Sequence, residues 1–277
     1  MQKDVGVAHV FSGQRWQPRE IKRVIGVMDT STKPIFASTD AGNSVVKYLG
    51  NRSGATALLC ELIGSELANA VGLTTPDFAV ARLPKIDLPD PSLTMEAGPA
   101  FFSRWEEAVR LEPDSELLAS LRQLDQLSLL VVFDTWIRNS DRYCTQDDFG
   151  FGVENYDNVL LSPDKRKVRM LVIDHSHALV EADFESEIGA AWIAEERVYG
   201  LFPEFVPHLT PQRVRKALSA VCRVDEALAL RVCRSAPSEW GMTEGLAVRL
   251  ARCIVERGAR LAGWLPQKLF NQQEMPL

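Results

Sequence analysis

The most informative stretch of this sequence is DTWIRNSDR at positions 134–142, a dense polar cluster that directly follows an apolar segment. A second stretch, IDHSH at positions 173–177, stands at the end of another apolar run. An acid that emerges from a buried strand is costly unless a metal ion, a backbone cap or a base pairs with it. Asp174 is such an acid. It either caps the following turn, the usual role of a lone Asp, or contributes to a metal site.

Asn158 favours the metal site. It comes directly before the apolar stretch 159–161, and the segment SPDKRK (162–167) connects this stretch to a strand predicted over 168–173. A hairpin with these bounds brings Asn158 and Asp174 close together at its open end. Amide and carboxylate oxygens are ligands that Mg²⁺ accepts in proteins, so the pair predicts a magnesium site.

Asp141 precedes this hairpin, so the order along the chain is Asp, then Asn, then Asp. Kinase active sites have the same order. The first Asp positions the acceptor hydroxyl and takes its proton, while the Asn and the last Asp hold Mg²⁺ on the phosphates. The three residues together therefore predict phosphoryl transfer.

A kinase also needs a strand Lys that reaches the phosphates and a helical Glu that holds this Lys. Lys47 ends the run VVK (45–47), shortly after the turn DAGN at 40–43, and Glu61 lies in a predicted helix among apolar neighbours. Taken alone, Lys47 reads as a solvated edge residue and Glu61 as a residue that faces water. Their order relative to the other three residues favours the kinase interpretation.

The remaining pattern predicts two lobes. The small lobe is β-rich, with strands over 21–28, 44–49 and 78–83 and a helix over 56–71 that ends at Gly72. Residues 84–100, rich in Pro, Asp and Gly, read as a loop or a linker. One long helix is predicted over 117–137, and most of the chain after the hairpin is predicted helical. The expected fold is α+β, with an N-lobe over 1–100 and a C-lobe over 101–277 that form one catalytic unit.

Composition narrows the function classes. The 277 residues carry 31 Lys+Arg against 37 Asp+Glu, a net charge of -6, without a Lys/Arg block that could neutralise duplex nucleic acid. The five cysteines are widely spaced, which is typical of reduced thiols. No apolar run suits a signal peptide or a membrane helix. We therefore expect a soluble cytoplasmic protein that binds neither duplex nucleic acid nor a membrane.

The chain resembles the HipA-like kinases and, more distantly, the phosphoinositide kinases, which share an atypical kinase architecture. The segments that carry the resemblance are FASTDAGNSVVK (36–47), ELIGSEL (61–67) with GLTTP (72–76), FDTWIRNSDR (133–142) and IDHSHA (173–178). They span residues 20–180. The resemblance implies a bilobal kinase-like fold that uses ATP and Mg²⁺.

The resemblance also implies the role of each residue. Lys47 would contact the ATP phosphates, oriented by Glu61 or by Glu66 one turn later. Asp141 would be the catalytic base, and Asn158 and Asp174 would be the Mg²⁺ ligands. The other implied nucleotide contacts are Ser38 and Gly42 in the turn segment, Phe102 in the stretch 98–103 at the lobe connection, and Arg142, which either supports its loop or touches phosphate.

Three further residues have structural interpretations. Asp134 and Asn139 would organise the catalytic loop through hydrogen bonds, and His177 would be a packed or hydrogen-bonded residue. His175 stands where most kinases have the Phe of Asp-Phe-Gly, as in the atypical relatives.

One departure from the kinase pattern concerns the metal ligand. The usual Asn comes five positions after the catalytic Asp, where this chain has Gln146. An insertion that moves the ligand to Asn158 restores the junction between Asn and strand, and Asn155 is a weaker substitute. If Gln146 fills the position, metal binding weakens and a pseudokinase results. The inserted loop carries Asp147, Asp148 and Glu154, which either select a basic partner or are simply solvated.

We therefore expect a kinase that phosphorylates a Ser or Thr hydroxyl of a protein substrate. The alternatives are a nucleotide-binding pseudokinase that acts as an interaction module, and a kinase-fold enzyme that modifies a small molecule or transfers a nucleotide. The toxin members of the family imply an antitoxin-like partner as well. They carry an additional N-terminal module, which we do not expect here because the chain begins close to the kinase-like strands.

Overall fold

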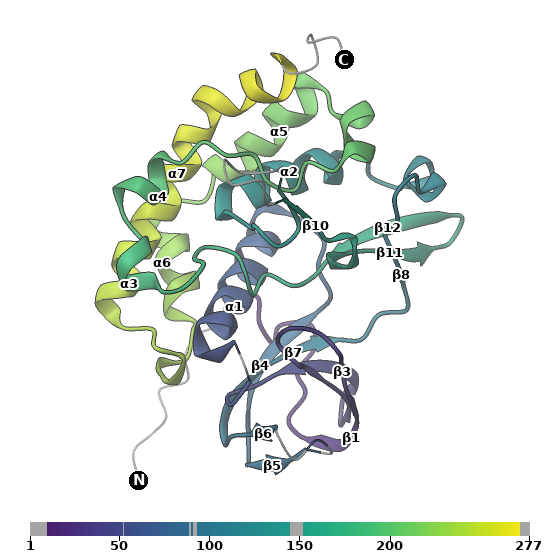
Figure 1. The fold of residues 1–277 in the computed structure, drawn as a ribbon, viewed down its shortest axis with the longest axis vertical. Helices are drawn as coiled ribbons and strands as arrows, with labels where there is room; N and C mark the ends of the chain where they lie inside the picture. Colours follow the sequence, from purple (N-terminus) through teal and green to yellow (C-terminus); the bar gives the residue numbers. More distant parts are fainter. Residues whose placement is uncertain (1–9, 52, 89, 91–92, 145–151, 272–277) are drawn as a thin grey trace.

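The computed structural model describes residues 10–51, 53–88, 90, 93–144 and 152–271. It shows a small β-rich lobe packed on a larger, mainly helical lobe, so the predicted α+β bilobal fold is confirmed (Figure 1). Gln146, Asp147 and Asp148 lie outside the described residues.

The small lobe is built on one antiparallel sheet of five strands in the order β1-β2-β3-β7-β4. The strands are β1 (Ile21–Val27), β2 (Ile35–Thr39), β3 (Gly42–Lys47), β4 (Phe78–Leu83) and β7 (Gly98–Arg104). Side chains alternate between the two faces. One face buries a small core around Ile35, Val46 and Phe102, and the other face, which carries Lys47 and Phe101, is turned toward the rest of the molecule.

Helix α1 (Gly54–Val71) follows β3 and is buried along nearly its whole length. Its buried residues fall on every face of the helix, as expected for a helix inside a core rather than on a surface. Leu58, Leu62 and Leu67 belong to the same large hydrophobic core as the helices of the C-terminal lobe. Gly72 ends α1 with a left-handed φ of 84°, at the stop that the sequence predicted.

The segment expected as a loop or linker, 84–100, is more ordered than its composition suggests. It forms the short pair β5 (Ile86–Asp87) and β6 (Thr94–Met95) and then returns into the main sheet as β7. The chain leaves the sheet only after Arg104, so this strand crosses the boundary expected at residue 100.

The prediction of one long helix over 117–137 is wrong for its first part. A 3-10 turn, η1 (Glu116–Ser120), is separated from helix α2 (Asp125–Ile137) by an extended stretch. Leu121 forms a β-bridge with Val168, and the amide of Arg122 donates to the carbonyl of Val168, so the backbone there pairs with a strand instead of continuing the helix.

The predicted hairpin is present as β11 (Val159–Asp164) and β12 (Lys167–Val172), and β8 (Val109–Arg110) pairs with β11. The short pair β9 (Tyr143–Cys144) and β10 (Val153–Glu154) precedes it, joined to β11 by η2 (Tyr156–Asn158).

Helices make up the rest of the large lobe. They are α3 (Phe184–Glu187), α4 (Ala190–Ala194), η3 (Pro203–His208), α5 (Pro211–Cys222), α6 (Glu226–Arg234), η4 (Ser238–Trp240) and α7 (Glu244–Asn271). Within the described part of the chain, no helix is both long and apolar enough to cross a membrane.

Candidate active site

Three charged side chains meet between the lobes. Lys47 Nζ, at the end of β3, lies 2.6 Å from Glu61 Oε2 of α1 and 2.7 Å from Asp174 Oδ1, which follows β12. The three residues come from three separate parts of the chain, and all three side chains are largely shielded from solvent. The structure thus brings together the Lys, Glu and final Asp of the predicted kinase set.

Backbone contacts hold Asp174 in place. The amide of His175 donates to Glu61 Oε2 at 3.0 Å, so the same carboxylate binds both Lys47 and the segment after Asp174. Asp174 has a left-handed φ of 57°, a conformation that Asp tolerates better than most residues. Ser176 donates to Asp174 Oδ1 through both its amide and its hydroxyl.

A glycine permits this close approach. A Cβ on Gly64 of α1, one turn after Glu61, would lie 2.5 Å from the Cβ of His175. The His175 ring packs edge-on against Phe133, and burial lowers its pKa well below the usual value, so the ring is neutral. Sequence reasoning missed Gly64, although a glycine inside an apolar helix often has a packing role.

The charges of the three residues are strongly coupled. Burial opposes the positive charge of Lys47, but Asp174 and Glu61 outweigh it and raise the pKa of the amine. Burial likewise works against the Asp174 carboxylate, yet Lys47 and Ser176 hold its pKa below the usual range. Burial raises the pKa of Glu61, an effect that Lys47 offsets in part. With all three ionised, the group keeps one excess negative charge, which favours a bound cation.

Asp141 lies in the loop after α2 and faces the open end of the hairpin. Its Oδ2 accepts hydrogen bonds from Asn158 Nδ2 at 3.2 Å and Asn155 Nδ2 at 3.3 Å. Burial raises the pKa of Asp141; the nearby His177 lowers it and the nearby Asp174 raises it. A carboxylate with a raised pKa is a better proton acceptor, so this position suits a general base.

The open end of the hairpin is arranged as the sequence suggested. Val159 pairs with Val172, and the amide of Ile173 donates to the carbonyl of Asn158 at 3.2 Å, so Asn158 stands beside the residue that precedes Asp174. The Nδ2 of Asn158 is engaged by Asp141, which leaves its amide oxygen as the atom to face a cation. Asn155, the weaker substitute in the sequence, contacts the same carboxylate.

The donor set fits Mg²⁺. Asn158 and Asp174 supply neutral and charged oxygens beside a group with excess negative charge, the donors that Mg²⁺ prefers. Within the described ranges, no group of three or more His, Cys, Asp or Glu side chains is arranged to hold a metal ion. In a kinase-type site, few protein ligands act together with the phosphates of the nucleotide.

The structure decides between the two roles predicted for Arg142, in favour of supporting the loop. Its side chain is 0% exposed, and it donates to the backbone carbonyls of Asn158 and Ile173 and forms an ion pair with Asp134 at 2.8 Å. It therefore joins the catalytic loop to both strands of the hairpin and is not available to touch a phosphate. Burial raises the pKa of Asp134 to about 6, and Arg142 opposes this rise.

The predicted hydrogen bonding of the catalytic loop is confirmed. Asn139 Nδ2 donates to Asp134 Oδ1 at 3.3 Å, and the amide of Asn139 donates to the carbonyl of Asp134. Gly200 lies against this pair, because a Cβ there would be 2.4 Å from Asp134 Oδ2.

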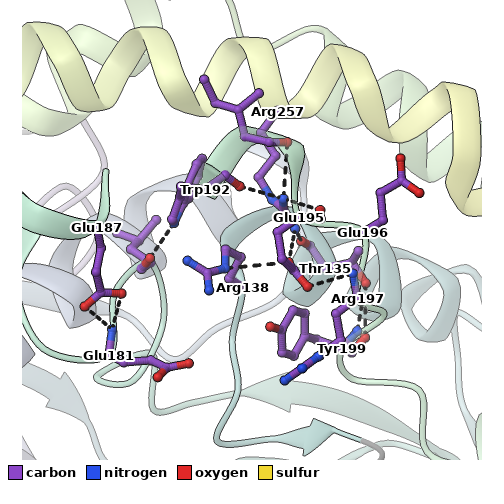
Figure 2. A network of polar contacts seen from close by, with 12 residues as sticks. Thr135, Arg138, Glu181, Glu187, Trp192, Glu195, Glu196, Arg197, Tyr199 and Arg257 are labelled. Carbon is purple, nitrogen blue, oxygen red and sulfur yellow. Dashed lines mark hydrogen bonds and ion pairs between the residues drawn. The ribbon is translucent and has the colours of Figure 1, made fainter. Parts of the chain in front are cut away.

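A second buried network fixes the end of α2, directly before this loop (Figure 2). Arg257 of α7 donates to the carbonyls of Thr135, Trp136 and Trp192 at 2.8 to 2.9 Å, and it also pairs with Glu195 at 3.0 Å. Burial lowers the pKa of Arg257 to about 10. Long-range contacts from the last helix therefore set where the catalytic loop begins.

Phe102 and Gly42 are not placed as predicted. Phe102 pairs with Val46 and is fully buried in the small core, on the opposite face of the sheet from Lys47, so its ring cannot touch a nucleotide. Gly42 has a φ of 108° and begins β3, at the other end of the strand from Lys47, roughly 17 Å away at about 3.3 Å per residue. The two cannot hold the same phosphate.

Ser38 does share the face of Lys47. It pairs with Asn43 in the β2–β3 register, and alternation places Asn43, Val45 and Lys47 on one side of the sheet. Its contact with a nucleotide stays a prediction.

Two segments that the sequence analysis did not consider also lie at the Lys47 end or on the Lys47 face of the sheet. The loop 28–34 between β1 and β2 lies at the Lys47 end of the sheet, since Ile35 pairs with Val46 and Tyr48 donates to the carbonyl of Lys33. On the Lys47 face, the rings of Phe36 and Trp105 are 4.7 Å apart, and Trp105 is 48% exposed where the chain leaves β7. In the sequence, the position of Trp105 shortly after the predicted linker 84–100 was the signal that could have drawn attention to this face.

Glu66 has a role different from that of Glu61. It is fully buried, and its carboxylate accepts the amides of Phe11 and Ser12 at 2.7 and 3.0 Å, which ties the segment before β1 to α1. Of the two acids weighed as the partner of Lys47, the structure therefore selects Glu61.

Comparisons with known proteins agree with this geometry. A family model described as HipA-like kinase matches residues 21–257. Among solved structures, the chain is similar to that of CtkA, a proinflammatory kinase of Helicobacter pylori, with a TM-score of 0.57 and 13% sequence identity. That match covers 93% of this chain and 98% of CtkA, and at this identity it shows a shared fold. No curated protein sequence gives a significant match.

Proposed function

The chain belongs to the HipA-like kinase family, and we propose that it transfers the γ-phosphate of ATP, with Mg²⁺, to a Ser or Thr hydroxyl of a protein in the cytoplasm. The observation that carries the proposal is the convergence of Lys47, Glu61 and Asp174 beside the loop that presents Asp141. None of the five cysteines, all of which lie in the described part of the chain, forms a disulfide, which suits a reducing compartment.

Each residue of the site has its own role in the proposed phosphoryl transfer. Lys47 Nζ exchanges its contact with Asp174 for a phosphate oxygen, while Glu61 keeps the amine in position. Asp141 accepts a hydrogen bond from the acceptor hydroxyl and takes its proton as the oxygen attacks phosphorus. Asn158 and Asp174 would hold Mg²⁺, which neutralises charge on the phosphates. Asn155 and Asn158 orient the Asp141 carboxylate through Oδ2.

The test is a transfer assay with γ-labelled ATP and Mg²⁺, with the protein itself and unstructured proteins such as casein as acceptors. Wild type is compared with Asp141→Asn and Asp174→Asn, and Arg215→Ala on the exposed surface of α5 is the control. Labelled phosphoserine or phosphothreonine from wild type and the control alone supports the proposal. Equal labelling by all four proteins contradicts it.

The same samples separate the alternative functions. Intact-mass measurement distinguishes an added phosphoryl group from an added nucleotide. Thermal stabilisation by ATP and Mg²⁺ without any transfer would identify a pseudokinase. The placement of Asn158 next to Asp174 favours an active enzyme, because it supplies the ligand that the spacing to Gln146 put in question.

A further inference from the structure

A groove runs along the C-terminal lobe outside the candidate active site. Three adjoining cavities of about 510, 620 and 410 Å³ form it, and their lining comes from the hairpin strand β12, the start of α2 and helix α5. Figure 1 shows where these three elements lie in the large lobe. The first two cavities share Arg122 and Gln126, and the last two share Asp125 and Arg213. We call this continuous surface the basic groove.

The charge of the basic groove is opposite to that of the protein. Five basic side chains line it, against two acidic ones, whereas the whole chain carries a net charge of -6. The basic residues are Arg122, Arg169, Arg213, Lys216 and Arg223, and the acids are Asp125 and Asp164. The exposed hairpin tip adds Lys165, Arg166 and Lys167 next to the first cavity. The chain concentrates its positive charge here.

Ion pairs within the protein neutralise only part of the positive charge in the groove. Arg213 and Lys216 both contact the single carboxylate of Asp125, and the Lys216 side chain remains 73% exposed. At the other end, Arg122 pairs with Asp164, and Arg169 pairs with Glu106 at 3.1 Å. In the described part of the chain, Arg223 has no ion pair within reach. An anionic ligand would therefore meet charge that the protein itself does not neutralise.

The floor of the groove is apolar. The central cavity is lined by Val71, Leu121, Leu129, Ala217 and Ala220, each of which keeps a small part of its surface, 4% to 8%, exposed. The groove is connected to the candidate active site through the backbone. Thr74, which lines the first cavity, accepts a hydrogen bond from the amide of Val172, two residues before Asp174.

We propose that the basic groove binds an acidic, amphipathic segment of a partner protein. Acidic side chains would pair with the basic rim, and apolar side chains would cover the floor. Among the described residues, those that line the three cavities include no aromatic side chain, and single-stranded nucleic acid uses such side chains for base stacking. The sequence has no Lys/Arg block of the kind that neutralises the phosphates of duplex nucleic acid.

The experiment measures fluorescence anisotropy with the full chain and a fluorescein-labelled peptide of alternating Glu and Leu. We expect binding that weakens as salt increases, since screening acts on the rim contacts. Lys216→Glu combined with Arg223→Glu should weaken it at least tenfold, a change of about 1.4 kcal/mol. Arg223→Glu alone, which breaks no ion pair among the described residues, should weaken it severalfold.

The matched control is Arg215→Glu combined with Arg231→Glu, which makes the same charge change on exposed positions of α5 and α6 outside the groove. This variant should bind like wild type, and a peptide with Lys in place of Glu should not bind. Thermal melting verifies that each variant is folded. The proposal is overturned if the acidic peptide does not bind, if both variants lose binding equally, or if labelled oligo(U) binds the groove more tightly than the peptide. It does not depend on phosphoryl transfer, so either proposal can fail alone.

Discussion

The two halves of the candidate site are built in contrasting ways. The lysine half consists of Lys47, Glu61 and Asp174, and its charges are buried and paired with one another. The aspartate half consists of Asp141 with its neighbours, and its carboxylate accepts hydrogen bonds from two neutral amides at 3.2 and 3.3 Å. One half fixes charge, whereas the other keeps a carboxylate able to change its protonation state.

This difference indicates what each half can do. Buried charges with fixed partners stabilise a negatively charged group without reorganisation during the reaction, which is the larger contribution in most enzymes. A carboxylate whose pKa is raised by burial and by a neighbouring acid can take up a proton. If the halves differ in this way, substitutions in the lysine half should affect both nucleotide binding and turnover, and those in the aspartate half turnover alone.

Asp174→Asn should have the largest effect, a loss of about 10⁴-fold in kcat/KM for ATP, because it removes a contact of Lys47 and a charged metal ligand together. The measurement is initial-rate kinetics over a range of ATP and Mg²⁺ concentrations. Asp164→Asn, in the exposed turn of the same hairpin, is the matched control and should retain the wild-type rate. A rate within tenfold of wild type for Asp174→Asn would show that the lysine half does not drive the reaction.

Asp141→Asn should lower kcat by about 10³-fold and leave the KM for ATP nearly unchanged, because the residue acts on the acceptor hydroxyl rather than on the nucleotide. Titration with a fluorescent ATP analogue provides the independent measurement of binding. A weakened affinity for that analogue, similar to the loss in Asp174→Asn, would remove the distinction between the halves.

The two acids of α1 sharpen the comparison further. Glu61→Gln should lower kcat/KM by about 10-fold to 10²-fold, since it loosens Lys47 without removing it. Glu66→Gln should leave the rate unchanged within twofold, because Glu66 binds the amides of Phe11 and Ser12 and lies outside the site. Equal losses in both variants would mean that α1 acts only as a scaffold.

Glu66 also gives a stability test of its own. Burial raises its pKa to about 7 from the ordinary 4.5, so the folded state binds the proton more tightly than the unfolded state. This contribution to stability is complete below about pH 4.5 and is lost as the pH rises through about 7. Urea unfolding of wild type across this window should show the decline, and Glu66→Gln should show a flatter profile.

Local sequence was enough to predict part of the site. The open end of the hairpin follows from strand lengths and one turn, so Asn158 and Asp174 could be placed together, and the order of Lys, Glu and Asp residues indicated the bilobal fold. Predictions that depend on pairing between distant segments failed. The face on which Phe102 lies depends on its register with β3 and β4, and the end of the sheet at which Gly42 lies depends on strand direction.

The break before α2 and the burial of Arg142 have the same origin. Leu121 is not helical because its backbone forms a β-bridge with Val168 of β12. The local sequence of residues 117–124 does not indicate this pairing with a distant strand. Arg142 is a charged residue in a polar loop, for which exposure is the default expectation. It is buried because Asp134 and two hairpin carbonyls, all contributed by the tertiary fold, satisfy its guanidinium group.

His177 provides the smallest and most specific test of the aspartate half. His177 lowers the pKa of Asp141, so kcat should increase with pH as Asp141 loses its proton, and His177→Ala should shift this rise to higher pH by on the order of 0.5 unit. His177→Lys places a positive charge at the same position and should keep the rise near its wild-type pH, while His208→Ala, distant on η3, should not shift it at all. Because a purely structural role of His177 would lower the rate at every pH without moving the profile, a shift in the Ala variant that is absent in the Lys variant would identify Asp141 as the titrating base, and an unmoved profile in His177→Ala would contradict that assignment.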